Sequence, residues 1–292
     1  MSRKERKEKE KKEKTKLTFR EVLRKIVFCI SLCVFLFSAY KLFWIAHDYI
    51  QNKLYYDEVQ KLAPKETEED GVKKYLFSSE DFDNLYSRNS DFRGWITIPN
   101  TKVNYPMVQG GDNDFYLTAG LDKNHVNGGS IFIAHDNPDP FNDQNTIIHG
   151  HHMKNGSMFG TLKKYKDEDF FNNNPIVYIS LRDKCLRYEI FSVYICDITT
   201  VVDTKTSPYM YSISNDDDYV KYLKSLKKKS WFQRKGFADF NKDDKIITLS
   251  TCSYEYENAR MLIHARLIDD EDTTDADKDN TTKGKDITEP EE

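Results

Sequence analysis

The clearest pattern along the chain is an apolar run at residues 26–46, which follows a strongly charged first segment. Within this run the first charged residue is Lys41, whose long side chain can reach an interface. About 20 helical residues span the hydrocarbon core of a bilayer, so the pattern predicts a transmembrane helix. The Lys- and Arg-rich segment 1–25 is then expected to stay in the cytoplasm, with everything beyond the helix outside.

A cleaved secretory signal peptide is the alternative interpretation of the apolar run. The sequence after the run has no convincing small-x-small cleavage site, which favours an uncleaved anchor. Residues 47–74 are polar, carry apolar positions at helical spacing and are interrupted by Pro64, so they predict a helical stalk or linker. At the other end, residues 269–292 have hardly an apolar side chain and predict an acidic disordered tail.

From about Asp91 the apolar pattern changes to short segments bounded by turn residues, which is typical of β-strands. The expected strands lie at residues 94–99, 103–108, 130–134, 146–149, 175–180, 186–198, 245–252 and 260–268. Long helices do not alternate with them, so the pattern favours an all-β barrel or sandwich over a parallel sheet. One helix is expected at residues 216–232, with three acidic residues at its start and five lysines further along.

Composition and cysteine usage exclude several classes of protein. The net charge of −4, with no basic stretch interleaved with aromatics in the middle of the chain, argues against a nucleic-acid partner. The five cysteines are odd in number and form no CxxC pattern, so neither a disulfide framework nor a zinc ribbon is indicated. Cys29 and Cys33 fall in the apolar run and are expected to be plain membrane-helix residues, whereas Cys185 and Cys196 fall in strand patterns, where a small buried side chain is the expectation. Cys252 alone has neighbours that point to chemistry.

Cys252 ends the apolar segment 246–252, and Arg260 begins the next strand pattern. A thiol at a strand end can be held rigidly and still reach solvent, as a nucleophile must. If the two strands are antiparallel neighbours, Cys252 and Arg260 face each other across the base of their loop. A guanidinium there would stabilise a thiolate or a carbonyl oxyanion. The alternative is a non-functional pair, in which a buried thiol and an unrelated surface arginine flank the same turn.

Three histidines follow another strand pattern, in the sequence His149-Gly150-His151-His152. Histidine titrates near neutral pH and can pass a proton between a thiol and a leaving amine. His151 follows the glycine directly, which indicates a side chain presented at the mouth of a β-structure. A metal site is the competing interpretation, but no Asp, Glu or Cys cluster at ligand spacing completes it. The histidine precedes the cysteine by 101 positions, whereas papain-like enzymes place the cysteine first.

These residues together resemble the sortases, the cysteine transpeptidases of Gram-positive bacteria. The resemblance is carried by Thr-Leu-Ser-Thr-Cys at residues 248–252, by Arg260 on the next strand, and by Gly150-His151 after an Asn-Thr-Ile-Ile strand. The run at residues 150–159, the long helix at 216–232 and the helical N-terminal extension are similar to class B sortases in particular. The resemblance covers roughly residues 75–268.

The resemblance implies a closed eight-stranded sortase barrel over residues 75–268, with one long helix inserted before the penultimate strand. It implies that Cys252 attacks the carbonyl of a threonine in a C-terminal sorting signal, at a Thr–Gly or Thr–Asn bond, and forms a thioacyl enzyme. His151 then protonates the leaving group, while Arg260 holds the substrate backbone and the oxyanion. An amine of the peptidoglycan resolves the thioester, which attaches the surface protein to the cell wall.

The resemblance also implies a substrate-binding set. It assigns Ser250 and Thr251 to the cleft, and it assigns Ser207 and Tyr209 to a loop at residues 204–214 that grips the sorting motif.

One position departs from the family pattern. His149 precedes the glycine, where a tyrosine or an asparagine is expected in relatives, so His149 and His152 stay open as alternatives to His151. No cofactor is implied, and metal independence is expected because no acidic cluster lies next to the substrate loop.

Two other functions stay open at the level of the sequence. A cysteine endopeptidase would use the same residues and differ only in that water, not an amine, takes the acyl group. A membrane-tethered, non-enzymatic domain that binds wall or protein ligands would not depend on Cys252, His151 or Arg260. The partners expected for the transpeptidase are surface proteins with a sorting signal, the peptidoglycan amine and the membrane around the N-terminal helix.

Overall fold

A closed β-barrel forms the main part of the chain, for which the computed structural model describes residues 19–69, 71–199, 207–253 and 255–272. The strand order around the barrel is β10-β8-β7-β3-β4-β5-β6-β9. The strands are β3 (Phe92–Thr97), β4 (Asn104–Val108), β5 (Ile131–Ile133), β6 (Asn145–His149), β7 (Ile176–Ser180), β8 (Lys184–Asp197), β9 (Ile246–Cys252) and β10 (Ala259–Asp272). The pairs β4–β5 and β6–β9 are parallel, and the other neighbours are antiparallel. The expected all-β fold with a closed eight-stranded barrel is confirmed.

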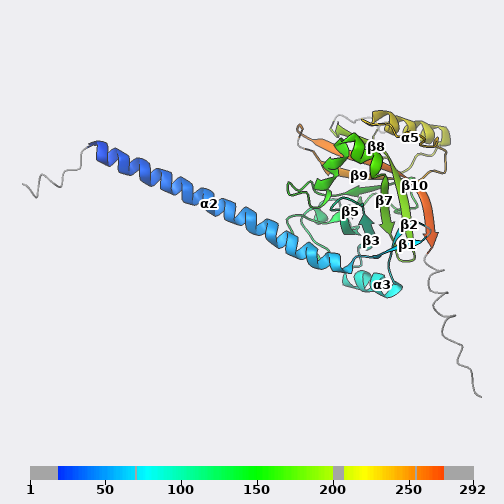
Figure 1. Cartoon of the computed structure of the whole chain (residues 1–292), viewed down its shortest axis with the longest axis horizontal. Coiled ribbons are helices and arrows are strands. Elements are labelled where there is room, and N and C mark those ends of the chain that lie inside the picture. Colours follow the sequence, from blue (N-terminus) through cyan, green and yellow to red (C-terminus); the bar gives the residue numbers. More distant parts are fainter. Residues whose placement is uncertain (1–18, 70, 200–206, 254, 273–292) are drawn as a thin grey trace, which may run out of the picture. The chain divides into compact units, whose positions relative to one another are not determined.

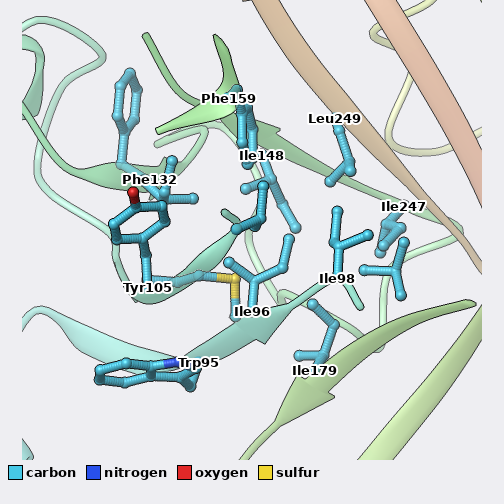
Figure 2. Packing of buried hydrophobic residues seen from close by; sticks show 14 of the residues in the cluster. Trp95, Ile96, Ile98, Tyr105, Phe132, Ile148, Phe159, Ile179, Ile247 and Leu249 are labelled. Atoms are coloured by element: carbon cyan, nitrogen blue, oxygen red, sulfur yellow. The ribbon is translucent and has the colours of Figure 1, made fainter. Parts of the chain in front are cut away.

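The interior of the barrel is filled with apolar side chains from most of its strands (Figure 2). This core includes Ile96, Ile148, Ile179, Ile247 and Leu249, all fully buried. Successive side chains of a strand point to opposite faces, so the residues that alternate with Ile247 and Leu249 lie on the outer face of β9. Those residues are Thr248, Ser250 and Cys252. Burial of one face thus fixes which β9 residues face outward, because a slip by one position would exchange the two sets.

A second hydrophobic cluster covers part of the outer face, beneath α5 (Asp216–Lys229; Figure 1). The side chain of Asn215 caps the helix by accepting from the Asp218 N–H, and the acidic first turn suits the helix dipole. The buried members of this cluster are Phe191, Tyr219, Tyr222, Leu223, Leu226, Phe240 and Ile246. The helix ends three residues before the expected position 232, because the Trp231 N–H donates to the Val193 carbonyl and draws the chain onto β8.

The long helix α2 (Phe19–Val59) crosses the boundary between the two compact units of the chain, which divide after Lys53. Its helical stretch Phe19–Leu62 is long and apolar enough to cross a membrane, by length and composition alone. In the second unit, Tyr56 and Val59 are buried in the barrel's hydrophobic cluster. The 3₁₀ turn η1 (Gln60–Leu62) ends this helical stretch two residues before Pro64.

The expectation of a helical stalk over residues 47–74 is wrong from Lys65 onward. The strands β1 (Lys65–Glu69) and β2 (Val72–Leu76) pair as an antiparallel hairpin. Gly71, at φ +77°, provides the left-handed backbone that this tight turn requires. The Tyr75 ring lies 4.9 Å from the Tyr178 ring of β7, which ties the hairpin to the barrel. Contact with the barrel, which a local pattern does not register, therefore decides the structure of this segment.

The shorter elements connect the barrel strands. They are α3 (Ser79–Arg88), η2 (Phe115–Leu117), η3 (Phe159–Lys166) and α4 (Glu168–Asn173). The expectation of a disordered tail at residues 269–292 is wrong for residues 269–272, which continue β10 to Asp272 by pairing with β8. Residues 273–292, the first 18 residues and residues 204–206 of the expected substrate loop lie outside the described residues.

The second hydrophobic cluster predicts a measurable loss of stability. Leu223→Ala is expected to lower the free energy of unfolding by about 2–5 kcal/mol, because Leu223 is fully buried beneath α5 and its truncation leaves a cavity. Denaturant unfolding of the detergent-solubilised chain measures the change. The neighbouring exposed residue provides the control, since Lys224→Ala should stay within about 0.5 kcal/mol. Equal losses of unfolding free energy for both variants would show that burial of the apolar face of α5 does not stabilise the fold.

Candidate active site

The parallel pair β6–β9 brings two distant segments to one end of the barrel. Its register pairs His149 with Ser250, and the same offset of 101 positions holds along the whole pairing. Beyond the last pair, the Gly150 N–H donates to the Ser250 carbonyl at 3.1 Å. His151 and Cys252 are also 101 positions apart. β6 ends at His149, so His151 comes two residues after the end of β6, as Cys252 comes two residues after Ser250.

The antiparallel strand β10 extends this row across the sheet. Arg260 is the direct partner of Cys252 on β9 and also of Cys196 on β8. Directly opposed residues in antiparallel strands project to the same face, and neighbouring strands lie about 4.8 Å apart. Cys252, Arg260 and Cys196 thus form an outer-face row. The sequence predicts that Cys252 and Arg260 face each other, and the register of β9 and β10 confirms it.

The alternation along β9 separates the two residues that precede Cys252. Ser250 lies on the outer face with Cys252, whereas Thr251 points to the opposite face, where its partner Met261 belongs to the core. Among the described residues, the buried Thr251 hydroxyl has no hydrogen-bond partner. The structure therefore brings the Ser250 side chain to the face of the thiol, but not that of Thr251.

Tyr209 closes over the outer face of β6 and β9. Its hydroxyl lies 2.9 Å from the Ser250 hydroxyl, and its ring centroid lies 6.0 Å from that of His149. The Tyr209 N–H donates to the Ser207 hydroxyl at 3.3 Å, so Ser207 belongs to the same turn. Burial raises the pKa of Tyr209 to about 12, which keeps its hydroxyl protonated at neutral pH. Two of the predicted substrate-binding residues, Tyr209 and Ser250, are thus in contact.

His149 is held in its neutral form. Burial, and then the positive charge of Arg260, lower the pKa of His149 to about 4. Its ring lies against Phe132, with 5.2 Å between the centroids. At neutral pH this histidine therefore carries no proton that it could donate as an imidazolium.

The two histidines after Gly150 have different backbone partners. His151 Nε2 lies 2.7 Å from the Leu117 carbonyl oxygen, which can only accept, so Nε2 carries the proton and Nδ1 can accept one. His152 Nδ1 donates to the carbonyl of Cys252 itself at 2.7 Å. The His152 bond holds the two chain segments together, and the His151 bond fixes the orientation of the imidazole ring. Sequence reasoning missed Leu117, because no motif marks a backbone carbonyl.

The loop between β9 and β10 adds a carboxylate near the thiol. The Ser253 N–H donates to the Ala259 carbonyl at 2.9 Å and closes the base of the loop. Glu255 accepts a hydrogen bond from the Ser253 hydroxyl and forms an ion pair with Lys166 at the end of η3. This carboxylate was not predicted, and its only sequence signal is its position three residues after Cys252.

A cavity of about 330 Å³ opens at the Cys196 end of the row. It is lined by Tyr194, Ile195, Cys196, Pro208, Lys229 and Trp231. Pro208 directly precedes Tyr209, so one turn of chain separates this cavity from the surface around Ser250. In the part of the chain that the structure describes, no three His, Cys, Asp or Glu side chains are grouped so as to hold a metal ion.

Comparisons with known proteins agree on one family. The sortase domain model matches residues 96–268. Sortase B of Listeria monocytogenes is 32% identical over 256 residues, which are 86% of this chain and 99% of that protein. The structure of sortase B from B. anthracis in complex with AAEK1 has a TM-score of 0.63 and 33% identity, and the match covers 76% of this chain and 98% of that one. The Staphylococcus aureus sortase B–substrate complex has a TM-score of 0.57 and 30% identity, covering 65% and 86%.

The closed eight-stranded barrel is the fold that the chain shares with the solved sortase B structures. The chain belongs to the sortase family and, within it, to the class B sortases. Membership of this family makes it a cysteine transpeptidase of the cell wall.

The lowered pKa of His149 predicts a pH dependence of stability. The unfolded chain binds a proton at this residue near its ordinary pKa of 6.5, whereas the folded chain does so only near pH 4. The stability that the neutral ring contributes is therefore present above pH 6.5 and is lost as the pH falls towards 4. Unfolding free energies measured between pH 7 and 4.5 should fall more for the parent chain than for His149→Gln. Parallel curves would contradict the lowered pKa.

Proposed function

We propose that the chain cleaves a C-terminal sorting signal after a threonine and joins that threonine to a peptidoglycan amine, with Cys252, His151 and Arg260 as the catalytic residues. The observation that carries this proposal is the outer-face row, together with the β6–β9 register that extends it to His151. A thiol, an imidazole and a guanidinium supply a nucleophile, a proton carrier and a cation for a developing oxyanion.

The reaction has two half-reactions on Cys252. The thiolate first attacks the threonine carbonyl carbon, the C–N bond breaks, and the leaving amine takes a proton from the His151 imidazolium. A thioester of Cys252 remains. The acceptor amine then attacks this thioester, passes its proton to His151, and the thiolate leaves as the new amide forms. The scheme requires no cofactor and no metal ion.

The surroundings of His151 support its role as the proton carrier. A hydrogen bond from Nε2–H to the Leu117 carbonyl fixes the ring orientation and leaves Nδ1 as the nitrogen that can accept a proton. His149, with a pKa of about 4, is poorly matched to protonating an amine near neutral pH. His152 is engaged through Nδ1 with the Cys252 backbone, which suits a structural role.

The electrostatic reach of Arg260 supports its role at the oxyanion. The pKa of His149 on β6 is lowered mainly by the burial of that histidine, and next by the positive charge of Arg260. Since β9 lies between β6 and β10, the same charge acts on any negative charge that develops at Cys252. Arg260 is half-buried, so water screens it less than an exposed charge.

The sorting signal is proposed to bind where Tyr209 meets Ser250, with Ser207 in the adjoining turn. Thr251, whose side chain faces the interior, would contribute through its backbone. The sortase B of Staphylococcus aureus, which this structure resembles, has been solved as a substrate complex. Similarity of fold to that complex supports a sorting signal as the ligand of this chain.

Residues 26–46 are proposed to anchor the chain in the cell membrane, with residues 1–25 in the cytoplasm and the catalytic domain outside. The excess of basic residues before the apolar run supports this orientation. Residues 47–74 would then connect the anchor to the catalytic domain at residues 75–268. Peptidoglycan acceptors and surface proteins meet on that side of the membrane.

The thioester predicts a covalent adduct that intact-mass spectrometry can detect. The full chain in detergent is incubated with peptides that vary the residues around a Thr–Gly or Thr–Asn bond, with and without an amine acceptor. An acyl adduct on Cys252 is expected, discharged by the amine into a new amide, and absent from Cys252→Ala. Cys196→Ala, which removes the other outer-face thiol, is the matched control and should keep the adduct.

The other outcomes distinguish the alternative functions. Acyl transfer only to water, even with abundant amine, would favour a cysteine endopeptidase. An adduct that persists in Cys252→Ala would exclude this thiol as the nucleophile. If no peptide acylates a chain whose Cys252 reacts normally with an alkylating agent, the transpeptidase proposal fails in favour of a binding domain.

A further inference from the structure

The segment at residues 207–213 passes over the outer face of β6 and β9 and contains neither strand nor helix. Its position is therefore not set by a ladder of backbone hydrogen bonds. Side chains from β6, β9, α5 and the residue before β6 bond to it instead. Because its Tyr209 lies on Ser250, two residues before Cys252, the groups that hold this segment also set the shape of the surface beside the thiol.

Gln144, the residue before β6, holds the far end of the segment through two hydrogen bonds. Its Oε1 accepts from the Ile213 N–H at 2.6 Å, and its Nε2 donates to the Ile213 carbonyl at 3.3 Å. The side-chain amide thus pairs with the backbone as a neighbouring strand would. The Gln144 carbonyl accepts from the Ile246 N–H and the Tyr219 hydroxyl, so this residue is itself fixed to β9 and α5.

Asn145 holds the segment one step nearer to the thiol, from a fully buried position. Its Nδ2 donates to the Met210 carbonyl at 2.9 Å, and its Oδ1 accepts from the Thr248 hydroxyl at 2.8 Å. The Thr248 oxygen then accepts from Nδ1–H of His264, 2.9 Å away, and His264 Nε2 accepts from the Tyr194 hydroxyl at 3.1 Å. Burial lowers the pKa of His264 to about 3, so the neutral ring that this chain of bonds requires is the form present.

The near end of the segment is held from α5. The Tyr222 hydroxyl donates to the Pro208 carbonyl at 3.1 Å, and Tyr222 itself is buried in the second hydrophobic cluster. The segment is thereby fixed at Pro208, Tyr209, Met210 and Ile213. Each bond comes from an element whose own position is set by the barrel or by α5.

We propose that Gln144 and Asn145 are positioning residues for recognition of the sorting signal. They hold the segment 207–213, termed the recognition segment, so that Tyr209 stays against Ser250 before substrate arrives. This pre-organisation removes an ordering cost that substrate binding would otherwise bear. Neither residue touches the reacting atoms, so their effect falls on binding and not on the chemical step. The inference rests on the proposed function, because that function identifies the sorting signal as the ligand. The hydrogen bonds to the recognition segment do not depend on it.

Gln144→Leu tests the proposal with little risk to folding, because Gln144 is half-exposed and its backbone bonds remain. Peptide binding is measured in the Cys252→Ala background with a peptide that acylates the parent chain. The dissociation constant is expected to rise about tenfold, as the loss of these hydrogen bonds implies. The acylation rate at saturating peptide is measured separately, with Cys252 intact, and should change by less than about threefold. Gln144→Glu, which keeps the acceptor and loses the donor, should give an intermediate constant.

The matched control is Gln60→Leu, which removes a half-buried glutamine that donates to the Asn104 carbonyl of β4. It should leave the dissociation constant unchanged. A second measurement needs no substrate, since hydrogen exchange followed by mass spectrometry reports directly on residues 207–215. Gln144→Leu should speed exchange in this peptide about tenfold and leave the β9 peptide unchanged.

Unchanged exchange in residues 207–215 would overturn the proposal, because the bonds would then not be what holds the segment. Faster exchange with an unchanged dissociation constant would overturn the recognition role. A fall in the acylation rate at saturating peptide, with binding unaltered, would also contradict it. Failure of every peptide to acylate the parent chain would instead refute the proposed function and with it the ligand, while the exchange result would still decide whether Gln144 holds the segment.

Discussion

The parallel pairing of β6 with β9 is the constraint on which the rest of the site depends. It fixes an offset of 101 positions between two segments, and the same offset separates His151 from Cys252. The pairing is in turn fixed by the core, because Ile148 on β6 and Leu249 on β9 must both face the interior. A slip of one residue would bury the thiol and expose the core. Packing energy thus specifies how the ends of β6 and β9 lie beside each other, and with them the positions from which the proposed catalytic residues extend.

The outer face of the barrel shows how the other parts build on this register. Antiparallel pairing adds Arg260 to the row, and its charge reaches across β9 to lower the pKa of His149. The second hydrophobic cluster fixes α5, and side chains from β6, β9 and α5 hold the recognition segment at the edge of the row. Cys252 and Arg260 lie at strand ends, whereas the side chains that hold the recognition segment come from β6, β9, α5 and the residue before β6.

Much of this organisation could be predicted from the sequence. The eight strands and the helix before β9 follow from local apolar patterns, and the pairing of Cys252 with Arg260 follows from a short loop between adjacent strands. The hairpin at residues 65–76 could not be predicted, because contact with β7 decides its structure. The roles of the Leu117 carbonyl and of Gln144 could not be predicted either, because their partners are distant in the chain. His151 lies 34 positions from Leu117, and Ile213 lies 69 positions from Gln144. Thr251 was assigned to the cleft from motif alone, and strand alternation turns its side chain inward.

The most direct test of the account is the rate at which Cys252 is acylated when each of the three neighbouring histidines is replaced by glutamine. Rapid-quench mass spectrometry with a reactive sorting peptide gives the three rates at constant fold, checked by unfolding. The register predicts that His151→Gln lowers the rate by about 10²–10⁴-fold, the usual worth of a positioned proton carrier. His149→Gln and His152→Gln should each cost less than about tenfold. If His152→Gln or His149→Gln abolished acylation while His151→Gln did not, the offset of 101 positions would not define the catalytic pair.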